Sequence, residues 1–576
     1  MTFTRRRRRA RRPRNASRLT WLLASLVVAS AACSTGDGDA TAPSSPDDTA
    51  VAAGSAPTTL GAGWTRPACD RPPADPPAAT AVAGIESDHD VISFDGTSIR
   101  AHWFPHPDAT AQDPAATVLM GPGWRLPGDT GAEAVTRSSP VGIGSLQAAG
   151  FNVLTWDPRG VGESGGTSSM VDDPDAEGRD VQVLLDWVAA QPEVRLDDEG
   201  DPRAGMVGGS YGGGIALVTA ASDCRVDALV PVASSYSLVA SLYPSETPKT
   251  SWGTLFVEAA EPGTVDPHVL SAIESSMAEG TISDEDVAWL AAQDPGELIG
   301  DVEVPTLIVQ GTVDTLFTLD EGVDSYHALR DDGVPVSMLW YCGGHGTCLT
   351  DPGDEARVDD AAVAWLQHWV LDDDTIDLGP AVEVIDQHGR TYAFDDYPVP
   401  TGTELTATGA GTLSLVADGG SGPAVAPLGV EDDPLREVLL PYTPGRAEHA
   451  VEVAVPTPDD SVLVLGEPLL RLRYSGITPD SSRPSRVYAQ LVDETTGLVL
   501  GNQVTPVPVT LDGRHHTVTL PLELVAYATE PGGDLTLQIV ATAAGYPQLS
   551  PTGEIRIDEI GITLPVAADV TPAGAP

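Results

Sequence analysis

The five residues Gly208-Gly209-Ser210-Tyr211-Gly212 stand between an apolar run that ends at Val207 and a helical stretch from Gly213 to Ala221. A strand, a sharp turn and a helix are the context in which G-x-S-x-G forms a nucleophile elbow. The glycines leave room for neighbouring backbone, and the serine is held at the C-terminal edge of a sheet, near the positive end of a helix. Because the chain has 59 glycines, chance matches are common, and the flanking strand and helix carry the prediction.

Serine is a weak nucleophile until a base removes its proton, so a histidine is expected nearby. Val336 to Tyr341 reads as the last strand of the alternating region, and Gly343-Gly344-His345-Gly346 follows at once. The small residues of this loop allow the imidazole to reach the serine. We predict His345 as the general base, and interpret His327 and His368, which lie in helical patterns, as structural or surface residues.

An acid that orients the histidine should follow the preceding strand. Thr306 to Gln310 is strand-like, and Gly311-Thr312-Val313-Asp314 comes directly after it. Asp320 and Asp324 are rivals that lie farther from the strand end. Asp314 would accept the second imidazole N–H and stabilise the imidazolium. The resulting order along the chain, Ser, Asp and His, is the order that the G-x-S-x-G fold requires.

Stabilisation of a developing oxyanion needs two preorganised N–H donors. Tyr211, directly after the nucleophile, supplies one. The second is expected in the loop Gly121-Pro122-Gly123-Trp124, where the proline has no N–H to donate. Trp124 is the predicted donor, with Gly123 as the alternative.

Strands and helices alternate between residues 85 and 372. The apolar runs that read as strands are Ala116 to Met120, Phe151 to Trp156, Ala204 to Val207, Ala228 to Val232, Thr306 to Gln310 and Val336 to Tyr341. Helical patterns such as Asp180 to Gln191 and Asp359 to Leu371 separate them. This predicts an α/β domain with a mostly parallel sheet that is covered on both faces. From about 236 to 300 the alternation lapses, which predicts a helical cap over the pocket or, alternatively, a plain surface insertion.

After residue 373 the helical periodicity disappears. Short strands rich in Val, Leu and Thr alternate with turns rich in Gly, Pro and Asp; examples are Leu469 to Tyr474, Val487 to Val492, His516 to Leu520, Leu535 to Ala541 and Glu554 to Leu564. This texture predicts an all-β sandwich over residues 380 to 570.

Residues 1 to 32 resemble an export signal rather than a folded element. A basic segment precedes Leu19 to Val28, an apolar stretch too short to cross a bilayer as a mature helix. Ser30-Ala31-Ala32-Cys33 is similar to a bacterial lipobox, although Ser30 stands where leucine is usual. We predict a lipid on Cys33, a tether over residues 33 to 84 and a place on the outer face of the bacterial cell membrane. Ordinary cleavage and secretion is the alternative.

The four cysteines that remain predict two disulfides, because an even number is typical of an oxidising compartment. Of the three connectivities we favour Cys342–Cys348 with Cys69–Cys224. The spacing C-x-x-H-x-x-C around the predicted base also suggests a metal site. No fourth ligand cluster stands nearby, so we expect no metal, and a bridge that rigidifies the loop of the base.

The chain is strongly acidic, with 83 Asp and Glu against 31 Lys and Arg and a net charge of −52. Removal of the predicted signal, which holds nine arginines and no acid, makes the rest more negative still. Such an anion is a poor partner for nucleic acid or for an anionic membrane surface. We therefore expect membrane contact only through a lipid on Cys33, and a solvated acidic shell that keeps an exported protein soluble; attraction of cationic substrates is the alternative.

Over about residues 85 to 570 the chain resembles the X-prolyl dipeptidyl peptidase and cocaine esterase family of α/β-hydrolases. Trp156 to Gly166 is similar to the D-x-R-G-x-G-x-S-x-G segment of this family, and Gly208 to Gly213 to its nucleophile segment. The further matches are Glu177 to Trp187 with Gln191-Pro192 in the next helix, and Gly466 to Leu469 and Ala489 to Asp493 in the C-terminal jelly roll.

The resemblance implies an α/β-hydrolase fold with a cap, followed by a jelly-roll sandwich, and triad roles for Ser210, Asp314 and His345. The chain departs from the family in the oxyanion loop, where many relatives have a tyrosine whose hydroxyl donates and this chain has Trp124. The backbone N–H of Trp124, or its indole N–H as the less favoured alternative, would then serve.

The family implies a serine hydrolase that cleaves an ester or amide bond through an acyl-enzyme, with a small peptide or ester as substrate and no cofactor. We predict an activity like that of X-prolyl dipeptidyl peptidases, with an acyl esterase or acylase of the cocaine esterase type as the alternative. A dipeptidyl peptidase must bind a free ammonium, for which Glu258 and Glu261 in the cap are candidates. A catalytically inactive, surface-binding lipoprotein is the alternative from another class.

Overall fold

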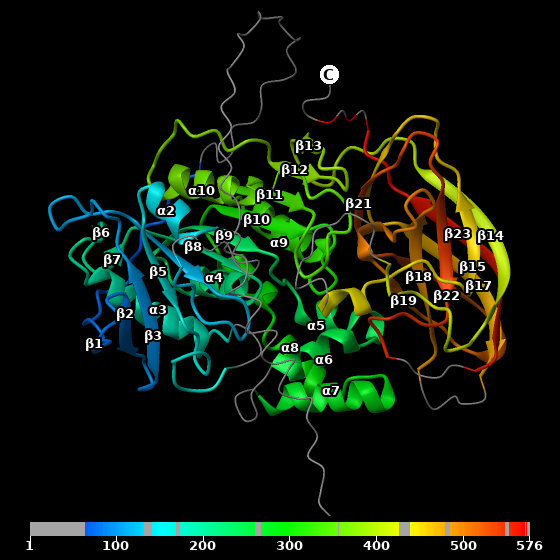
Figure 1. Ribbon diagram of the computed structural model, residues 1–576, viewed down its shortest axis with the longest axis horizontal. Helices are drawn as coiled ribbons and strands as arrows, with labels where there is room; N and C mark the ends of the chain where they lie inside the picture. Colours follow the sequence, from blue (N-terminus) through cyan, green and yellow to red (C-terminus); the bar gives the residue numbers. More distant parts are fainter. Residues whose placement is uncertain are drawn as a thin grey trace, which may run out of the picture.

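The computed structural model describes residues 64–131, 141–168, 173–259, 266–354, 356–425, 438–478, 484–547, 552–568, 570 and 572. Figure 1 shows two bodies side by side, a helix-covered sheet drawn in blue to green and an all-β sandwich drawn in yellow to red. The predicted fold class, an α/β-hydrolase domain followed by a β-sandwich, is therefore confirmed. The predicted signal and its lipidated Cys33 lie outside the described residues.

The larger body is built on an 11-stranded sheet with the order β1-β2-β3-β5-β4-β8-β9-β10-β11-β12-β13. Its seven consecutive strands from β5 to β12 run parallel. The strands are β1 (Ala79–Ala81), β2 (Asp88–Ile92), β3 (Ser98–Phe104), β4 (Thr117–Gly121), β5 (Asn152–Trp156), β8 (Ala204–Gly209), β9 (Val226–Val232), β10 (Thr306–Gly311), β11 (Val336–Tyr341), β12 (Val382–Ile385) and β13 (Thr391–Phe394). Because helices cover both faces, the central strands are buried along their whole length and read as continuous apolar runs.

Helices α3 (Glu177–Ala189), α4 (Tyr211–Ser222) and α9 (Leu319–Asp331) pack on one face of the sheet, and α2 (Ile143–Ala148) and α10 (Arg357–Val370) on the other. Apolar residues at helical spacing direct this packing. In α3 the buried positions include Val181, Leu184, Leu185 and Val188; in α10 they include Val358, Ala362, Trp365 and Leu366.

The smaller body has two four-stranded antiparallel sheets with the orders β14-β23-β17-β20 and β15-β22-β18-β19. Its strands are β14 (Leu405–Ser414), β15 (Ala450–Val455), β17 (Leu469–Ile477), β18 (Arg486–Asp493), β19 (Thr505–Pro508), β20 (Asp512–Pro521), β22 (Leu535–Val540) and β23 (Glu554–Leu564), with the extra pair β16 (Leu463–Gly466) and β21 (Val525–Ala528). Alternate residues of β15 and β17 are buried, as expected for strands with one face on a core.

The boundary between the two bodies differs from the sequence prediction, which began the sandwich at residue 380. Strand β12 pairs parallel to β11, and β13 returns antiparallel to β12, so both belong to the large sheet. Each strand has only four residues and follows a turn, so in the sequence it looks like a sandwich strand. The prediction failed because strand texture does not say which sheet a strand joins.

The predicted tether, residues 33 to 84, is also too long. From Trp64 onward the chain packs on the hydrolase domain: the Trp64 ring stands edge-on to Trp369, and the Arg66 guanidinium donates to the carbonyl of Trp369 and pairs with Asp227 at 3.1 Å. Residues Ala79–Ala81 form the edge strand β1. The segment is rich in Pro and Ala and lacks periodicity, so its sequence shows neither the ion pair nor the disulfide that fastens it.

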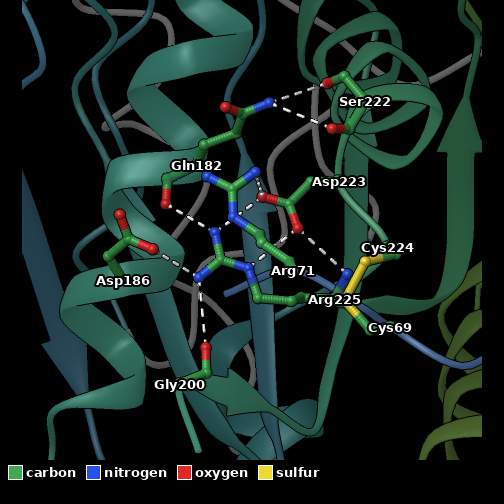
Figure 2. Close-up of a disulfide and its surroundings, with 9 residues drawn as sticks. All are labelled: Cys69, Arg71, Gln182, Asp186, Gly200, Ser222, Asp223, Cys224 and Arg225. Atoms are coloured by element: carbon green, nitrogen blue, oxygen red, sulfur yellow. Dashed lines mark hydrogen bonds and ion pairs between the residues drawn. A yellow bond between two sulfur atoms is a disulfide. The ribbon is translucent and has the colours of Figure 1, made fainter. Parts of the chain in front are cut away.

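A disulfide joins Cys69 of this segment to Cys224, across 155 residues of chain (Figure 2). Beside it, the buried carboxylate of Asp223 accepts from the guanidinium of Arg225 and pairs with Arg71 at 3.2 Å. The pairing of Cys69 with Cys224 is the connectivity expected from the sequence. Together the disulfide and the ion pairs fasten the N-terminal segment to the turn before β9.

The predicted cap, about residues 236 to 300, lies between β9 and β10 and is a set of short helices: α5 (Leu238–Leu242), α6 (Thr250–Ala259), α7 (Pro267–Glu279) and α8 (Asp284–Ala291). In Figure 1 these helices lie beneath the large sheet and beside the sandwich. Hydrogen bonds tie them to the sandwich: the Oγ and the N–H of Ser251 donate to the carbonyl of Gly545 at 3.1 Å and 3.2 Å, and Arg486 Nη1 donates to the carbonyl of Gly280 at 3.1 Å. The cap therefore contacts both bodies.

In the part of the chain that the structure describes, none of the helices combines the length and the apolar character that crossing a membrane requires.

We expect the double substitution Cys69→Ser with Cys224→Ser to lower the free energy of unfolding of the hydrolase domain by about 2–5 kcal/mol, because the bridge restricts a very long loop in the unfolded chain. Unfolding in urea can be followed by tryptophan fluorescence, since no tryptophan lies after Trp369 and the sandwich contributes no signal. An unchanged urea midpoint would mean that the ion pairs alone hold the segment.

Candidate active site

Ser210 lies at the sharp turn between β8 and α4 with φ 56° and ψ −120°, a conformation that residues with a side chain rarely adopt. Its N–H donates to the carbonyl of Val232 on the neighbouring strand at 2.7 Å. A Cβ placed on Gly208 would lie 2.4 Å from the backbone of Gly212, and one on Gly212 would lie 2.3 Å from the carbonyl oxygen of Gly121. The two glycines of the motif are thus required by close backbone approach, as the sequence pattern predicts.

The structure brings the three predicted triad residues together at the carboxyl ends of three strands, β8, β10 and β11. His345 Nε2 lies 2.7 Å from Ser210 Oγ, and His345 Nδ1 lies 2.8 Å from Asp314 Oδ2. Both distances are within hydrogen-bonding range. The hydroxyl, the imidazole and the carboxylate form a continuous relay.

The carboxylate of Asp314 is completely buried and fully hydrogen-bonded. Oδ1 accepts from the N–H groups of Leu316 at 2.9 Å and Phe317 at 2.8 Å, while Oδ2 accepts from the backbone N–H of His345 at 2.9 Å as well as from its ring. A buried charge is tolerated when it is paired and hydrogen-bonded in this way. The acid loop and the base loop are therefore joined through one side chain.

The glycines around His345 are needed for this approach. A Cβ on Gly344, whose φ is 87°, would lie 2.4 Å from Asp314 Oδ2, and one on Gly346 would lie 1.6 Å from the carbonyl oxygen of Val313. The disulfide between Cys342 and Cys348 closes the same loop, as expected from the sequence. Within the described ranges no group of three or more metal-ligating side chains is found.

Aromatic side chains surround the imidazole. Trp252 of α6 stands edge-on to His345 with ring centroids 5.8 Å apart, and Phe317 of the acid loop at 5.0 Å. Phe256, one turn along α6, packs at 5.0 Å against Trp124 of the predicted oxyanion loop. Two aromatic side chains of α6 therefore contact the two parts of the site: Trp252 contacts the base, and Phe256 contacts the oxyanion loop.

The predicted oxyanion loop leaves the end of β4 and lies against the first turn of α4. A Cβ on Gly212 would come within 2.8 Å of the carbonyl oxygen of Pro122, which shows how closely the two backbones pass. Tyr211 opens α4, directly after the nucleophile. The indole N–H of Trp124 is buried and has no hydrogen-bond partner among the described residues.

An apolar pocket, partly open to solvent, lies within the cap. Residues of α6, α7 and α8 line it, among them Gly253, Phe256, Ile273, Met277 and Leu290. The triad residues are not part of its lining. Phe256, which faces the pocket and also contacts Trp124, connects it to the oxyanion loop.

The D-x-R-G segment after β5 has a structural part in this site. Asp157 accepts from the N–H groups of Gly128 at 2.9 Å and Glu163 at 2.8 Å, which fixes the loops beside the oxyanion loop. Arg159 makes two hydrogen bonds of 2.7 Å to the carboxylate of Asp180 at the start of α3. Although burial opposes the charge, the bond to Asp180 keeps the pKa of Arg159 above its usual value.

Sequence reasoning missed the groups that hold the acid loop from outside. Lys249, the one lysine of the sequence, is buried in the cap and donates to the carbonyl of Leu316 at 3.1 Å. Gln503 of the sandwich donates to the carbonyl of Asp314 at 2.7 Å. No local motif marks such residues, because their partners are 67 and 189 positions away.

The rival acids do not reach the imidazole. The half-buried Asp320 faces the sandwich, where its Oδ2 accepts from the N–H of Leu524 at 3.4 Å. Burial and the nearby carboxylate of Glu523 raise the pKa of Asp320 well above its usual range. Burial likewise raises the pKa of Asp324.

Comparison with known families gives a match over residues 95–347 to the model of the X-Pro dipeptidyl-peptidase (S15) family. Among curated proteins, a polyketide transferase of a Penicillium species is 28% identical over 147 residues, which are 26% of this chain and 44% of that protein. An uncharacterized protein of Pseudomonas aeruginosa is 35% identical over 94 residues, 16% of this chain and 24% of that protein. The chain thus spans less than half the length of these curated relatives.

Solved structures resemble nearly the whole described chain. A CocE/NonD family hydrolase from Staphylococcus aureus has a TM-score of 0.60 at 12% identity and covers 84% of this chain and 93% of its own. An aminopeptidase from a marine sediment Thaumarchaeota archaeon has 0.61 at 13%, covering 87% and 99%, and an α-amino acid ester hydrolase has 0.59 at 14%, covering 84% and 98%. At such identities the likeness shows the fold alone. Together with the family match it confirms the resemblance inferred from the sequence.

We expect Gly344→Ala to slow the covalent labelling of Ser210 by a fluorophosphonate at least about tenfold, because the added methyl group displaces the Asp314 carboxylate and disturbs the relay. Gly333→Ala is the matched control: Gly333 also has a positive φ, 78°, but a Cβ there meets nothing within 4 Å. Equal labelling rates in the two variants would show that the approach of Gly344 to Asp314 is unimportant.

Proposed function

We propose that this chain, whose residues 95–347 match the X-Pro dipeptidyl-peptidase family, cleaves an ester or amide bond through an acyl-enzyme on Ser210. The observation that carries the proposal is the relay from Ser210 Oγ through His345 to the buried Asp314 carboxylate. A serine so placed can transfer its proton to the imidazole as it attacks.

In the first half of the reaction, Ser210 Oγ bonds to the substrate carbonyl carbon while its proton passes to His345 Nε2. The tetrahedral intermediate collapses as the bond to the leaving alcohol or amine breaks, and the imidazolium gives that group its proton. In the second half, water attacks the acyl-enzyme, with His345 again taking and returning a proton, and the acid product leaves. Asp314 stays ionised and stabilises the imidazolium in both halves.

The negative charge on the carbonyl oxygen needs two donors. We assign the first to the backbone N–H of Tyr211, which follows the nucleophile at the start of α4. The second is assigned to the backbone N–H of Trp124, with Gly123 as the alternative. The buried indole N–H of Trp124 is the less favoured donor.

Two substrate classes have separate support. The family match favours an X-prolyl dipeptide, whose free ammonium would need a carboxylate at the pocket. Of the two candidate carboxylates, Glu258 is exposed on α6, and Glu261 lies outside the described residues. The aromatic surroundings of His345 favour an apolar acyl group, as in an acyl esterase or acylase.

We also propose that the protein works outside the bacterial cell membrane, held by a lipid on Cys33. The lipobox-like sequence and the two disulfides support an oxidising, exported location. The proposed partners are a small peptide or ester substrate, with no nucleic acid.

Replacement of Ser210 by Ala is expected to lower turnover by about 10⁶, because the triad acts as a unit. The first measurement is labelling with a fluorescent fluorophosphonate. Wild type and the control Ser222→Ala, at the far end of the same helix α4, should label equally, and Ser210→Ala should not label. A folded wild type that fails to label would favour the inactive surface-binding lipoprotein instead.

A substrate panel separates the two classes. We expect hydrolysis of X-Pro anilides with a free amino group to exceed that of the same anilides after N-acetylation if the enzyme is a dipeptidyl peptidase, because the acetyl group removes the ammonium. Equal rates on both anilides, together with higher kcat/KM on short acyl esters, would assign it to the acyl esterases.

A further inference from the structure

A tight turn of the sandwich abuts the acid loop. The turn η5 (Leu500–Asn502) follows β18, with Leu500 buried in the sandwich core and with positive φ at Gly501 (61°) and Asn502 (55°). A Cβ on Gly501 would lie 3.0 Å from the carbonyl oxygen of Thr312, so the turn meets the first residues after β10. A turn fixed in one core therefore ends against a catalytic loop of the other body.

Two amide side chains of this turn donate to the two loops of the triad. Asn502 Nδ2 lies 2.9 Å from the carbonyl oxygen of Thr347, in the loop of His345, and Gln503 Nε2 lies 2.7 Å from the carbonyl oxygen of Asp314. Both side chains are at most 8% exposed, and Thr347 and Asp314 at most 2%. The bonds are thus shielded from water that could replace them.

From this arrangement we propose that Asn502 and Gln503 are positioning residues of the triad. Neither touches the reacting atoms; they hold the acid loop and the base loop at a fixed separation, so that the Asp314 carboxylate stays in register with the imidazole. The inference rests on the proposed function, because the role is defined by the triad. It assigns the sandwich a part in the organisation of the active site.

The backbone carbonyl of Asp314 is the group through which Gln503 positions the acid loop. The side chain of Asp314 is satisfied within the hydrolase domain, but its carbonyl oxygen points to the sandwich and receives Gln503. Without that donor a buried acceptor is left unpaired, and the loop is expected to shift to satisfy it. A shift of about 1 Å in a catalytic group can cost about 10² in rate.

Loss of the Gln503 hydrogen bond should displace the acid loop only in part. Lys249 Nζ holds the carbonyl of Leu316, and Gln310 Nε2 holds the carbonyl of Phe317 at 2.6 Å, so the acid loop keeps two other anchors. The expected change is therefore in the orientation of Asp314 and not in the presence of the loop.

The test compares two glutamines of the same interface in the full-length protein. Gln503→Met keeps the size of the side chain and removes the donor. The matched control is Gln387→Met: the Gln387 side-chain amide bridges the turn after β12 to the backbone of Ala528 in β21, while the Gln387 backbone carbonyl, which the substitution keeps, accepts from the N–H of Asp351 after the base loop. Both substitutions remove hydrogen bonds that a side-chain amide makes between the two bodies. Urea unfolding measures the free energy of unfolding lost in each variant.

We expect the two variants to lose similar stability, while the fluorophosphonate labelling rate and kcat fall about 10- to 100-fold in Gln503→Met alone, with KM within about threefold of wild type. The downfield proton resonance of the His345–Asp314 hydrogen bond should move or broaden in Gln503→Met only. Should that variant fold poorly, Asn502→Gly removes the other donor at a backbone angle that glycine accepts.

The inference is overturned if Gln503→Met and Asn502→Gly match Gln387→Met in labelling rate, in kcat and in the proton resonance. That result would leave the proposed function intact. Wild type that does not label would instead overturn the proposed function, and the inference with it.

Discussion

One buried negative charge, the carboxylate of Asp314, imposes the arrangement of everything around it. A carboxylate without access to water must have each oxygen paired, and here the donors are two N–H groups of its own loop and two groups of His345. Those donors are available only when the loops after β10 and β11 run side by side, with glycine where they touch. The serine completes the relay from a third strand end.

The same loops are where the cap and the sandwich meet the hydrolase domain. Lys249 reaches the acid loop from the cap, and Gln503 reaches it from the sandwich. Solved structures at 12–14% identity share the arrangement of sheet and sandwich over most of their length. Such an architecture can persist while few residues stay the same, because burial pattern and strand order define it.

Much of the fold and of the candidate site could be predicted from the sequence. Apolar runs located the parallel strands, and the rule that catalytic groups follow strand ends in the order Ser, Asp, His selected three residues. The structure joins these residues through His345 by hydrogen bonds of 2.7 Å and 2.8 Å. Two kinds of fact escaped the sequence prediction. The sequence of a short strand such as β12 does not indicate which sheet the strand joins. The segment from Trp64 to Cys69 has no periodicity that would indicate its packing on the hydrolase domain. Long-range contacts such as that of Gln503 have no local signature.

The N-terminal segment is attached at one edge of the parallel sheet, and the triad lies at the opposite edge. Trp64, Arg66 and Cys69 meet the hydrolase domain near the amino ends of β9 and β10, whereas Ser210 and His345 follow the carboxyl ends of their strands. A strand of six residues separates these edges by about 20 Å. The segment at Trp64 therefore meets the domain at the edge of the sheet opposite to the relay, and the length of the parallel strands separates a change in this segment from the catalytic groups.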